Sequence, residues 1–150
     1  MYTVKDFPNR DALQDYLNGV ILGQPLAAPV LGLDGLTFAV TPQGGSKITV
    51  TFSDADGAGL LPQQVLSQIT AASTQALDGK VALRNYGYTN SKNPQLAVVQ
   101  IGAVVDAAGT ANALLGFPAT QQTVAEISTS AIEAIVFNSS NATYTVITHA

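Results

Sequence analysis

The chain contains no cysteine and no tryptophan, and its only histidine is His149. Without cysteine there is no disulfide framework and no thiol chemistry, so packing or contacts between subunits must stabilise the fold. Without tryptophan, a sugar-binding site would have to use tyrosine rings, and Tyr86 and Tyr88 are the only close pair. His149 lies one residue from the C-terminus, which is a poor place for a positioned catalytic base.

Charge is also scarce. Only 11% of the 150 residues are charged, whereas 47% are hydrophobic. This balance excludes an intrinsically disordered chain, which needs low hydrophobicity and high charge. It leaves a surface of neutral polar groups, which lose water at a lower free-energy cost than ions do. The composition favours a surface that is covered in an assembly, with an ordinary low-charge globular domain as the alternative.

The basic residues form no stripe or cluster along the chain. Because phosphate binding needs such a cluster, we expect no direct contact with nucleic acid. No apolar run approaches the roughly 20 residues of a membrane span, so we expect no membrane insertion. The first residues include charged side chains and no apolar segment, so we expect no secretory signal and synthesis in a cytoplasm. The six basic residues are Lys5, Arg10, Lys47, Lys80, Arg84 and Lys92.

We predict an α+β fold: one domain over residues 1–150, mainly antiparallel β-sheet, with an N-terminal helix, a central packing helix and extended terminal arms. The N-terminal helix falls within residues 1–22, where Asn9 is a good N-cap. Its apolar face repeats at helical spacing. That face comprises Ala12, Leu13, Tyr16, Leu17, Val20 and Ile21.

Residues 23–35 are predicted to be an extended apolar arm, because Pro25 and Pro29 fix φ and bar a helix. Such an arm packs either on its own domain or on a neighbouring one. Residues 118–150 are predicted to hold a further helix and a strand. Within 120–136 a helix is favoured over a strand, and 142–148 is a strand that is either paired inside the sheet or exposed as an edge.

The central block, residues 36–117, is predicted to be a β-β-α-β-β core. Pro42-Gln43-Gly44-Gly45 makes the hairpin turn, and the second hairpin strand alternates apolar and threonine residues. A helix follows over 62–72, with Pro62 at its first position. Residues 96–101 form the most hydrophobic strand, which should lie centrally in the sheet. The segment 109–117 reads as a single helical turn capped by Thr110 and ended by Gly116.

No combination of residues in the sequence predicts a catalytic site or a metal site. The segment Asp54–Gly59 begins like a calcium loop, but Ala58 stands at the fifth position and Val65 at the twelfth, where ligands are required. Glu126 and Glu133 would share one helical face as solvated carboxylates without a basic or histidine partner. We therefore predict no catalytic, metal-binding or cofactor-binding residue, and no enzymatic activity.

The order of elements in residues 36–117 resembles modules of tailed-bacteriophage virion proteins. The resemblance rests on a hairpin ending in Thr-Val-Thr-Phe, a helix with Val-Leu-Ser-Gln-Ile-Thr-Ala-Ala, two strands, and Gly-Thr-Ala-Asn-Ala-Leu-Leu-Gly-Phe. The block is also similar to the flagellin and hook-associated insertion module, whose helix commonly reads Ile-Asn-Ala where this chain has Ile69-Thr70-Ala71. Both resemblances imply a repeated, non-enzymatic subunit.

The resemblance implies a structural subunit of a virion that is assembled in the host cytoplasm, with head decoration or neck favoured over tail or baseplate. Its partners would be other copies of itself and other virion proteins. The alternative is a flagellar or pilus-like accessory, or a cell-surface carbohydrate-binding module. On this view the termini are contact arms, and a chain lacking residues 1–30 should fold but not assemble. The predicted assembly contacts are Phe7, Leu13, Leu26, Val30, Tyr144 and Val146.

Overall fold

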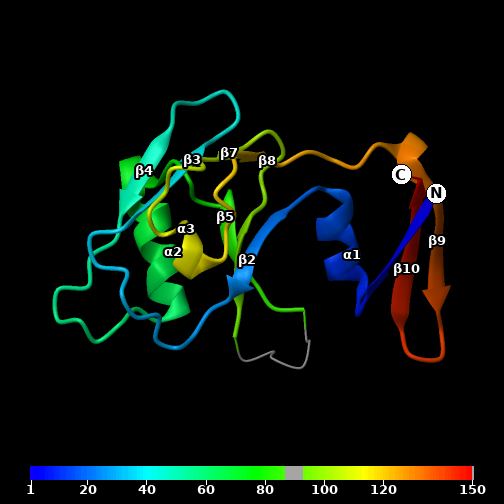
Figure 1. Cartoon of the computed structure of the whole chain (residues 1–150), viewed down its shortest axis with the longest axis horizontal. Coiled ribbons are helices and arrows are strands. Elements are labelled where there is room, and N and C mark those ends of the chain that lie inside the picture. The colour runs from blue at the N-terminus through cyan, green and yellow to red at the C-terminus, as the bar shows by residue number, and fades with distance from the viewer. Residues whose placement is uncertain (87–92, 150) are drawn as a thin grey trace.

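A computed structural model of the chain describes residues 1–86 and 93–149. Its elements form three antiparallel sheets with helices packed between them, which confirms the predicted α+β class (Figure 1). In chain order they are β1 (Tyr2–Phe7), α1 (Arg10–Leu17), β2 (Ile21–Pro25), β3 (Thr37–Thr41), β4 (Ile48–Thr51), α2 (Pro62–Ala71), a 3-10 turn (Ala72–Gln75), β5 (Val81–Arg84), β6 (Gln95–Val98), β7 (Val104–Val105), α3 (Asn112–Leu115), β8 (Gln122–Thr123), a second 3-10 turn (Thr129–Ala131), β9 (Ile132–Asn138) and β10 (Thr143–His149).

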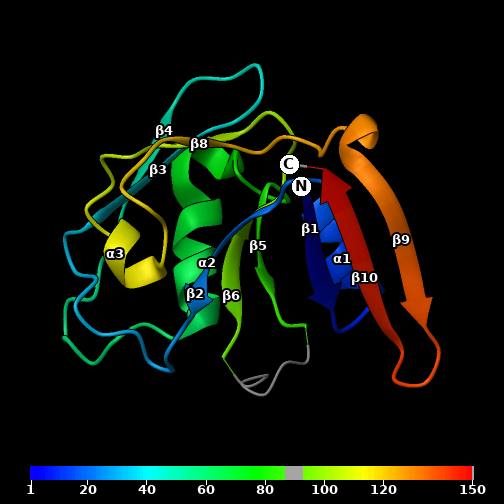
Figure 2. The ribbon, with the colours of Figure 1, turned by 45° about the vertical axis from the view of Figure 1, so that its right-hand side comes forward.

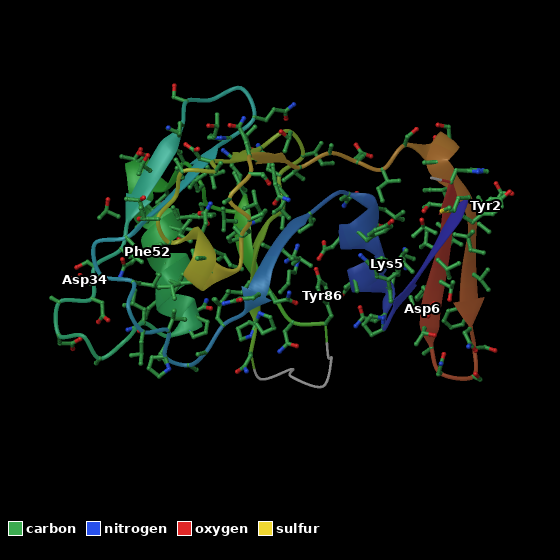
Figure 3. All side chains as sticks on the ribbon, in the orientation of Figure 1. Tyr2, Lys5, Asp6, Asp34, Phe52 and Tyr86 are labelled. Atoms are coloured by element: carbon green, nitrogen blue, oxygen red, sulfur yellow. The ribbon has the colours of Figure 1, made fainter. Side chains whose placement is uncertain are left out.

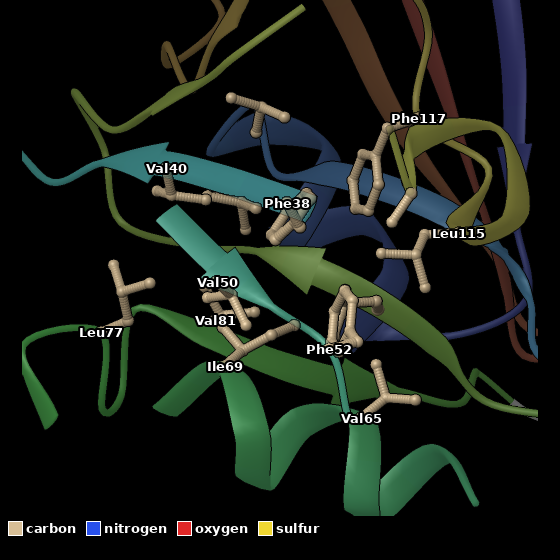
Figure 4. Packing of buried hydrophobic residues seen from close by; sticks show 14 of the residues in the cluster. Phe38, Val40, Val50, Phe52, Val65, Ile69, Leu77, Val81, Leu115 and Phe117 are labelled. Atoms are coloured by element: carbon tan, nitrogen blue, oxygen red, sulfur yellow. The ribbon is translucent and has the colours of Figure 1, made fainter. Parts of the chain in front are cut away.

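The larger core lies between two of these sheets and α2. One sheet has the strand order β4-β3-β7-β8 and the other has the order β2-β6-β5. The predicted central strand over 96–101 is therefore confirmed in its position, but it ends at Val98. Val65 and Ile69 of α2 point into this core, where Ile69 lies beside Val81 (Figure 4). The predicted hairpin is present, with Val40 opposite Ile48.

Local sequence signals place α2 and α3 where they were expected. Pro62 occupies the first turn of α2, and the side chain of Gln64 accepts a 2.8 Å hydrogen bond from the Leu61 N–H, which satisfies one free donor at that helix end. Gly116 ends α3 in the left-handed conformation with φ +83°. Thr110 does not cap α3, because its hydroxyl oxygen instead accepts from the Thr37 N–H at 2.8 Å.

Within residues 1–22 the predicted N-cap Asn9 is confirmed, but the helix is shorter than predicted and an unpredicted strand precedes it. Residues 2–7 form strand β1, which pairs antiparallel with β10 and places Phe7 opposite Tyr144. Asn9 caps α1 by accepting from the Ala12 N–H at 3.0 Å, but α1 ends at Leu17. Ile21 then begins β2. The segments on either side of α1 are strands because β1 pairs with β10 and β2 pairs with β6. Both partners are distant in the sequence, so no local sequence signal indicates the pairing.

The apolar segment 23–35 packs on its own domain. Leu26 and Val30 are buried in the larger core together with Leu33. The Leu26 N–H donates to the Pro94 carbonyl at 2.9 Å, and Val30 exchanges two backbone hydrogen bonds with Leu60 at 2.8 and 2.9 Å. Of the two predicted alternatives, the segment therefore packs on its own domain and not on a neighbouring one.

The predicted helix within 120–136 is wrong. Val124 donates to the Ala103 carbonyl beside β8, and β9 occupies residues 132–138 as a strand paired with β10. The apolar residues of this segment recur at a spacing that also fits a helix. Its β-branched side chains and the hairpin with β10 decide the outcome.

The third sheet is built from both ends of the chain, in the order β1-β10-β9, and we call it the terminal sheet. It lies beside the larger core, with α1 between the two, and β9 is its outermost strand (Figures 1 and 2). The C-terminal strand β10 is thus paired on both sides. Among the described residues no helix has the length and apolar character needed to cross a membrane.

Candidate interaction surface

The terminal sheet has an inner face that packs on α1. Strand β10 contributes Val146, which is buried in a second cluster with Phe7 and Leu13. The ring centroids of Phe7 and Tyr16 lie 4.8 Å apart, and the Lys5 ammonium lies 4.9 Å from the centre of the Tyr16 ring. Figure 3 shows Lys5 on the side of β1 toward α1. Helix α1 therefore covers the middle of this face.

The opposite face of the terminal sheet is open. Directly opposite residues point to the same face of a sheet, so Val4, Ile147 and Ala134 form one row across the outer face. The adjacent row contains Asp6, Thr145 and Val136, and the Thr145 hydroxyl donates to Asp6 at 2.5 Å.

The two edges of this sheet differ in charge. Edge strand β1 carries Lys5 and Asp6 in its middle, and charged side chains on an edge strand oppose pairing with other chains. Edge strand β9 has no charged residue from Ala134 to Asn138. Its free side therefore offers unpaired backbone groups without a charge to deter a partner strand.

Strand β9 also exposes three consecutive apolar side chains. Ile135 is 46% exposed, Val136 is 49% exposed and Phe137 is 53% exposed. Because side chains alternate between faces, Val136 points outward while Ile135 and Phe137 point to the α1 side, beyond the reach of that helix. The Phe137 ring packs against the Tyr144 ring in a tilted arrangement, with ring centroids 5.0 Å apart. A run of three exposed apolar residues in a strand is unusual unless a partner covers it.

A β-bulge interrupts the regular pairing of β9 near its N-terminal end. The register between β9 and β10 shifts so that Thr148 faces Ile132 while Ile147 faces Ala134, which leaves Glu133 as the extra residue. Glu133 Oε2 lies 2.6 Å from His149 Nε2, an ion pair when the imidazole is protonated. The regular part of the free edge is therefore Ala134–Asn138.

The sequence-predicted assembly contacts are mostly inside the chain. Five of the six are buried and the sixth, Tyr144, is half-buried in the cluster beneath the terminal sheet. In this fold their side chains pack within the chain and are not presented to a neighbour. The buried ones are Phe7, Leu13, Leu26, Val30 and Val146. The exposed apolar residues of β9, which were not among the predicted contacts, form the candidate interaction surface instead. The turn 138–141 before a strongly β-prone segment is the sequence signal that could have indicated strand β9.

In the loop Asp54–Gly59, the two carboxylates accept hydrogen bonds from backbone N–H groups of the same loop. Asp54 Oδ2 accepts from the Gly59 N–H at 3.0 Å, and Asp56 Oδ1 accepts from the Ala58 N–H at 3.1 Å. The hydrogen bond from Ala58 is the main cause that lowers the pKa of Asp56 below its usual value. In residues 1–86 and 93–149 no group of three or more His, Asp or Glu side chains is placed to hold a metal ion.

The acidic residues assigned to one helical face lie elsewhere. Glu126 is exposed in the irregular segment between β8 and β9, so it shares no helix with Glu133. The expectation that Glu133 lacks a histidine partner is wrong, because the pairing of β9 with β10 brings His149 to it. The side chains of Glu133 and His149 are both exposed to solvent at the end of the terminal sheet.

A cavity of about 290 Å³ lies where α1, β1 and the end of β5 meet. It is lined by Lys5, Phe7, Tyr16 and Tyr86, among others. Tyr86 is buried and its hydroxyl donates to Asp15, so it is not a solvent-facing platform for a sugar. Tyr88, the other half of the predicted tyrosine pair, lies outside the described residues.

The chain matches no protein-family model, no curated protein and no solved structure.

Proposed function

We propose that the chain is a non-enzymatic structural subunit of a bacteriophage virion, and that it joins its neighbours through the terminal sheet. The observation that carries this proposal is the uncharged free edge of β9, with Ile135, Val136 and Phe137 exposed side by side. Within the virion, a head-decoration or neck position is favoured over tail or baseplate, as the resemblance implies. The partners are other copies of the chain and other virion proteins.

The composition of the chain supports a role in assembly. A partner that covers this surface has few ions to desolvate, because 11% of all residues are charged. An exposed strand edge gives main-chain hydrogen bonds to an added strand, and the side chains beside it give specificity. Repetition around a symmetric particle then multiplies a modest contact.

The first test is whether the chain is part of the particle. Phage particles whose genome encodes the chain are purified by density gradient, and the chain is quantified by mass spectrometry against the major coat protein. The proposal expects a fixed ratio of chain to coat protein across the particle peak. A chain that stays in the soluble fraction of the lysate would contradict the proposal.

The second test is whether the terminal sheet makes the contact. Phe137→Glu places a charge on the free edge, whereas Leu61→Glu places one on an equally exposed apolar side chain at the start of α2. In cells that supply the variant in place of the wild-type chain, Phe137→Glu should lower incorporation into particles at least about tenfold. Leu61→Glu should be incorporated as the wild type is. Equal incorporation of both variants would contradict docking through β9.

A further inference from the structure

We propose that the free edge of β9 pairs with β9 of a second copy of this chain, antiparallel and centred on Val136. The proposal deepens the proposed function by naming the partner at that surface. The occupant is a second copy because the edge can pair with itself in a register that contains no charged residue and places its exposed apolar side chains opposite one another.

The charge pattern selects β9 over β1 as the self-pairing edge. Two β1 strands related by a twofold axis would bring Lys5 and Asp6 of both copies into the joint, where charged side chains must be desolvated. Two β9 strands bring no charged residue into the joint when only Ala134–Asn138 pair. The same sheet thus has one edge that resists an added strand and one that accepts it.

The bulge at Glu133 selects the register. A twofold axis through Val136 pairs all five residues of the regular segment and leaves Glu133 outside it. An axis through Ala134 or Ile135 draws the bulge and Glu133 into the joint, and an axis through Phe137 pairs only three residues. The axis through Val136 therefore gives the longest uninterrupted ladder.

This register also covers every exposed apolar side chain of the edge. Val136 faces Val136 of the copy on the outer face, and Ile135 faces Phe137 of the copy on the α1 side. Aromatic and β-branched residues directly opposite one another stabilise an antiparallel pair. The two terminal sheets then form one continuous sheet of six strands, in the order β1-β10-β9 followed by its twofold image.

The pair is weak in isolation because it is small. Five residues a side bury much less than the roughly 1,600 Å² of a stable complex, so we expect a dissociation constant on the order of 0.1 mM, in the range of transient contacts. In a particle, the high effective concentration of neighbouring copies would hold such a joint closed.

The test is sedimentation velocity of the full chain from about 5 µM to about 1 mM, a range that spans the expected dissociation constant. The wild type should shift from monomer to dimer. Val136→Lys should weaken the dimer at least about tenfold, because two like charges meet at the axis. Val4→Lys is the matched control: it is an exposed valine on the other edge strand of the same sheet, and it should dimerise as the wild type does.

A mixed experiment tests the register. Val136→Glu alone should also dimerise at least about tenfold more weakly than the wild type, but an equimolar mixture of Val136→Lys and Val136→Glu should form a heterodimer at lower concentration than either variant alone, because each residue 136 faces the other. Far-UV circular dichroism of each variant checks that it is folded. If the folded variants do not pair when mixed, the register through Val136 is wrong.

The outcomes separate this inference from the proposed function. A wild-type chain that is monomeric at all concentrations, or one in which Val4→Lys disrupts the dimer as strongly as Val136→Lys, overturns self-pairing through β9. The purified-particle experiment is independent of this result. A chain that is present in particles but monomeric in solution at 1 mM would leave the structural role intact and make another virion protein the occupant of the edge.

Discussion

The Tyr86 hydroxyl donates a 2.5 Å hydrogen bond to Asp15 Oδ2, across 71 positions of sequence. Arg84 Nε donates to the same oxygen at 2.9 Å. These bonds join α1, which carries the terminal sheet, to the end of β5 in the larger core. The orientation of the β9 edge relative to the rest of the molecule therefore depends on a buried carboxylate with two donors.

Replacing Tyr86 by Phe should lower the free energy of unfolding by about 1–3 kcal/mol, because the buried Asp15 loses one donor. Urea denaturation followed by circular dichroism measures the change. Tyr144→Phe is a control of identical chemistry in the terminal sheet, at a tyrosine that is half-buried where Tyr86 is buried. A stability loss for Tyr144→Phe equal to that for Tyr86→Phe would contradict a specific role of the bond to Asp15.

The segment 23–35 should behave as core. Leu26→Ala should lower the free energy of unfolding by about 2–5 kcal/mol, because Leu26 is 1% exposed within the larger core. Leu31→Ala removes the same atoms from a side chain that is 62% exposed and should change stability by less than about 0.5 kcal/mol. Equal effects in urea denaturation would mean that the segment is not part of the core. For the same reason, a chain lacking residues 1–30 should not fold cooperatively.

Gly116 should tolerate no side chain. An added Cβ would lie 2.2 Å from the Gln24 backbone nitrogen, and the residue has φ +83°. Gly79 also has a positive φ, +72°, but an added Cβ would meet nothing within 4 Å. Gly79→Ala should therefore lower the free energy of unfolding by about 1 kcal/mol, from backbone strain alone. Gly116→Ala should lower it by more, because the added Cβ also clashes with the backbone of β2. Thermal unfolding of the two variants measures the difference, and equal melting temperatures would contradict the close approach of α3 to β2.

The pair Lys47–Asp106 should add stability at neutral pH that is lost in acid. Its hydrogen bond, with Nζ to Oδ2 at 2.9 Å, is the main cause that lowers the pKa of Asp106 below its ordinary 3.8. A carboxylate with a lowered pKa stabilises the fold above its unfolded pKa, and the contribution disappears as the pH falls through the folded value. The stability difference between wild type and Asp106→Asn should therefore be constant from pH 7 to about 5 and shrink below about 4. A stability difference between the two proteins that grows as the pH falls would show that the pKa of Asp106 is not lowered in the fold.

The sequence predicted the parts of the fold whose signals are local. Pro62 marks the start of α2, the Pro-Gln-Gly-Gly turn marks the β3–β4 hairpin, and Gly116 marks the end of α3. Strand β1 could not be found in this way. Residues 2–7 are strand because β10 lies beside them, and β10 is more than 130 residues away in the sequence.

The candidate surface was missed for a related reason. Val124, Ile127, Ala131 and Ile135 recur at a spacing that fits a helix, whereas the structure places only Ile135 of these four in strand β9, where pairing with β10 fixes it. The side chains that were assigned to contacts with neighbours instead pack within the chain, Leu26 and Val30 in the larger core and the other four beneath the terminal sheet. The turn 138–141 before β10 is a signal for a hairpin and hence for strand β9, but the sheet order is needed to show that β9 lies at the edge with its apolar side chains exposed.

Amide hydrogen exchange measured on intact particles and on the free chain tests docking through β9 most directly. On the proposed function, amides within Ala134–Asn138 should exchange at least about tenfold more slowly in the particle, because strand addition hydrogen-bonds the free edge. Amides of the exposed turn residues 43–46 should exchange at the same rate in both samples. Unchanged exchange in β9, with protection appearing elsewhere on the chain, would contradict docking through the terminal sheet.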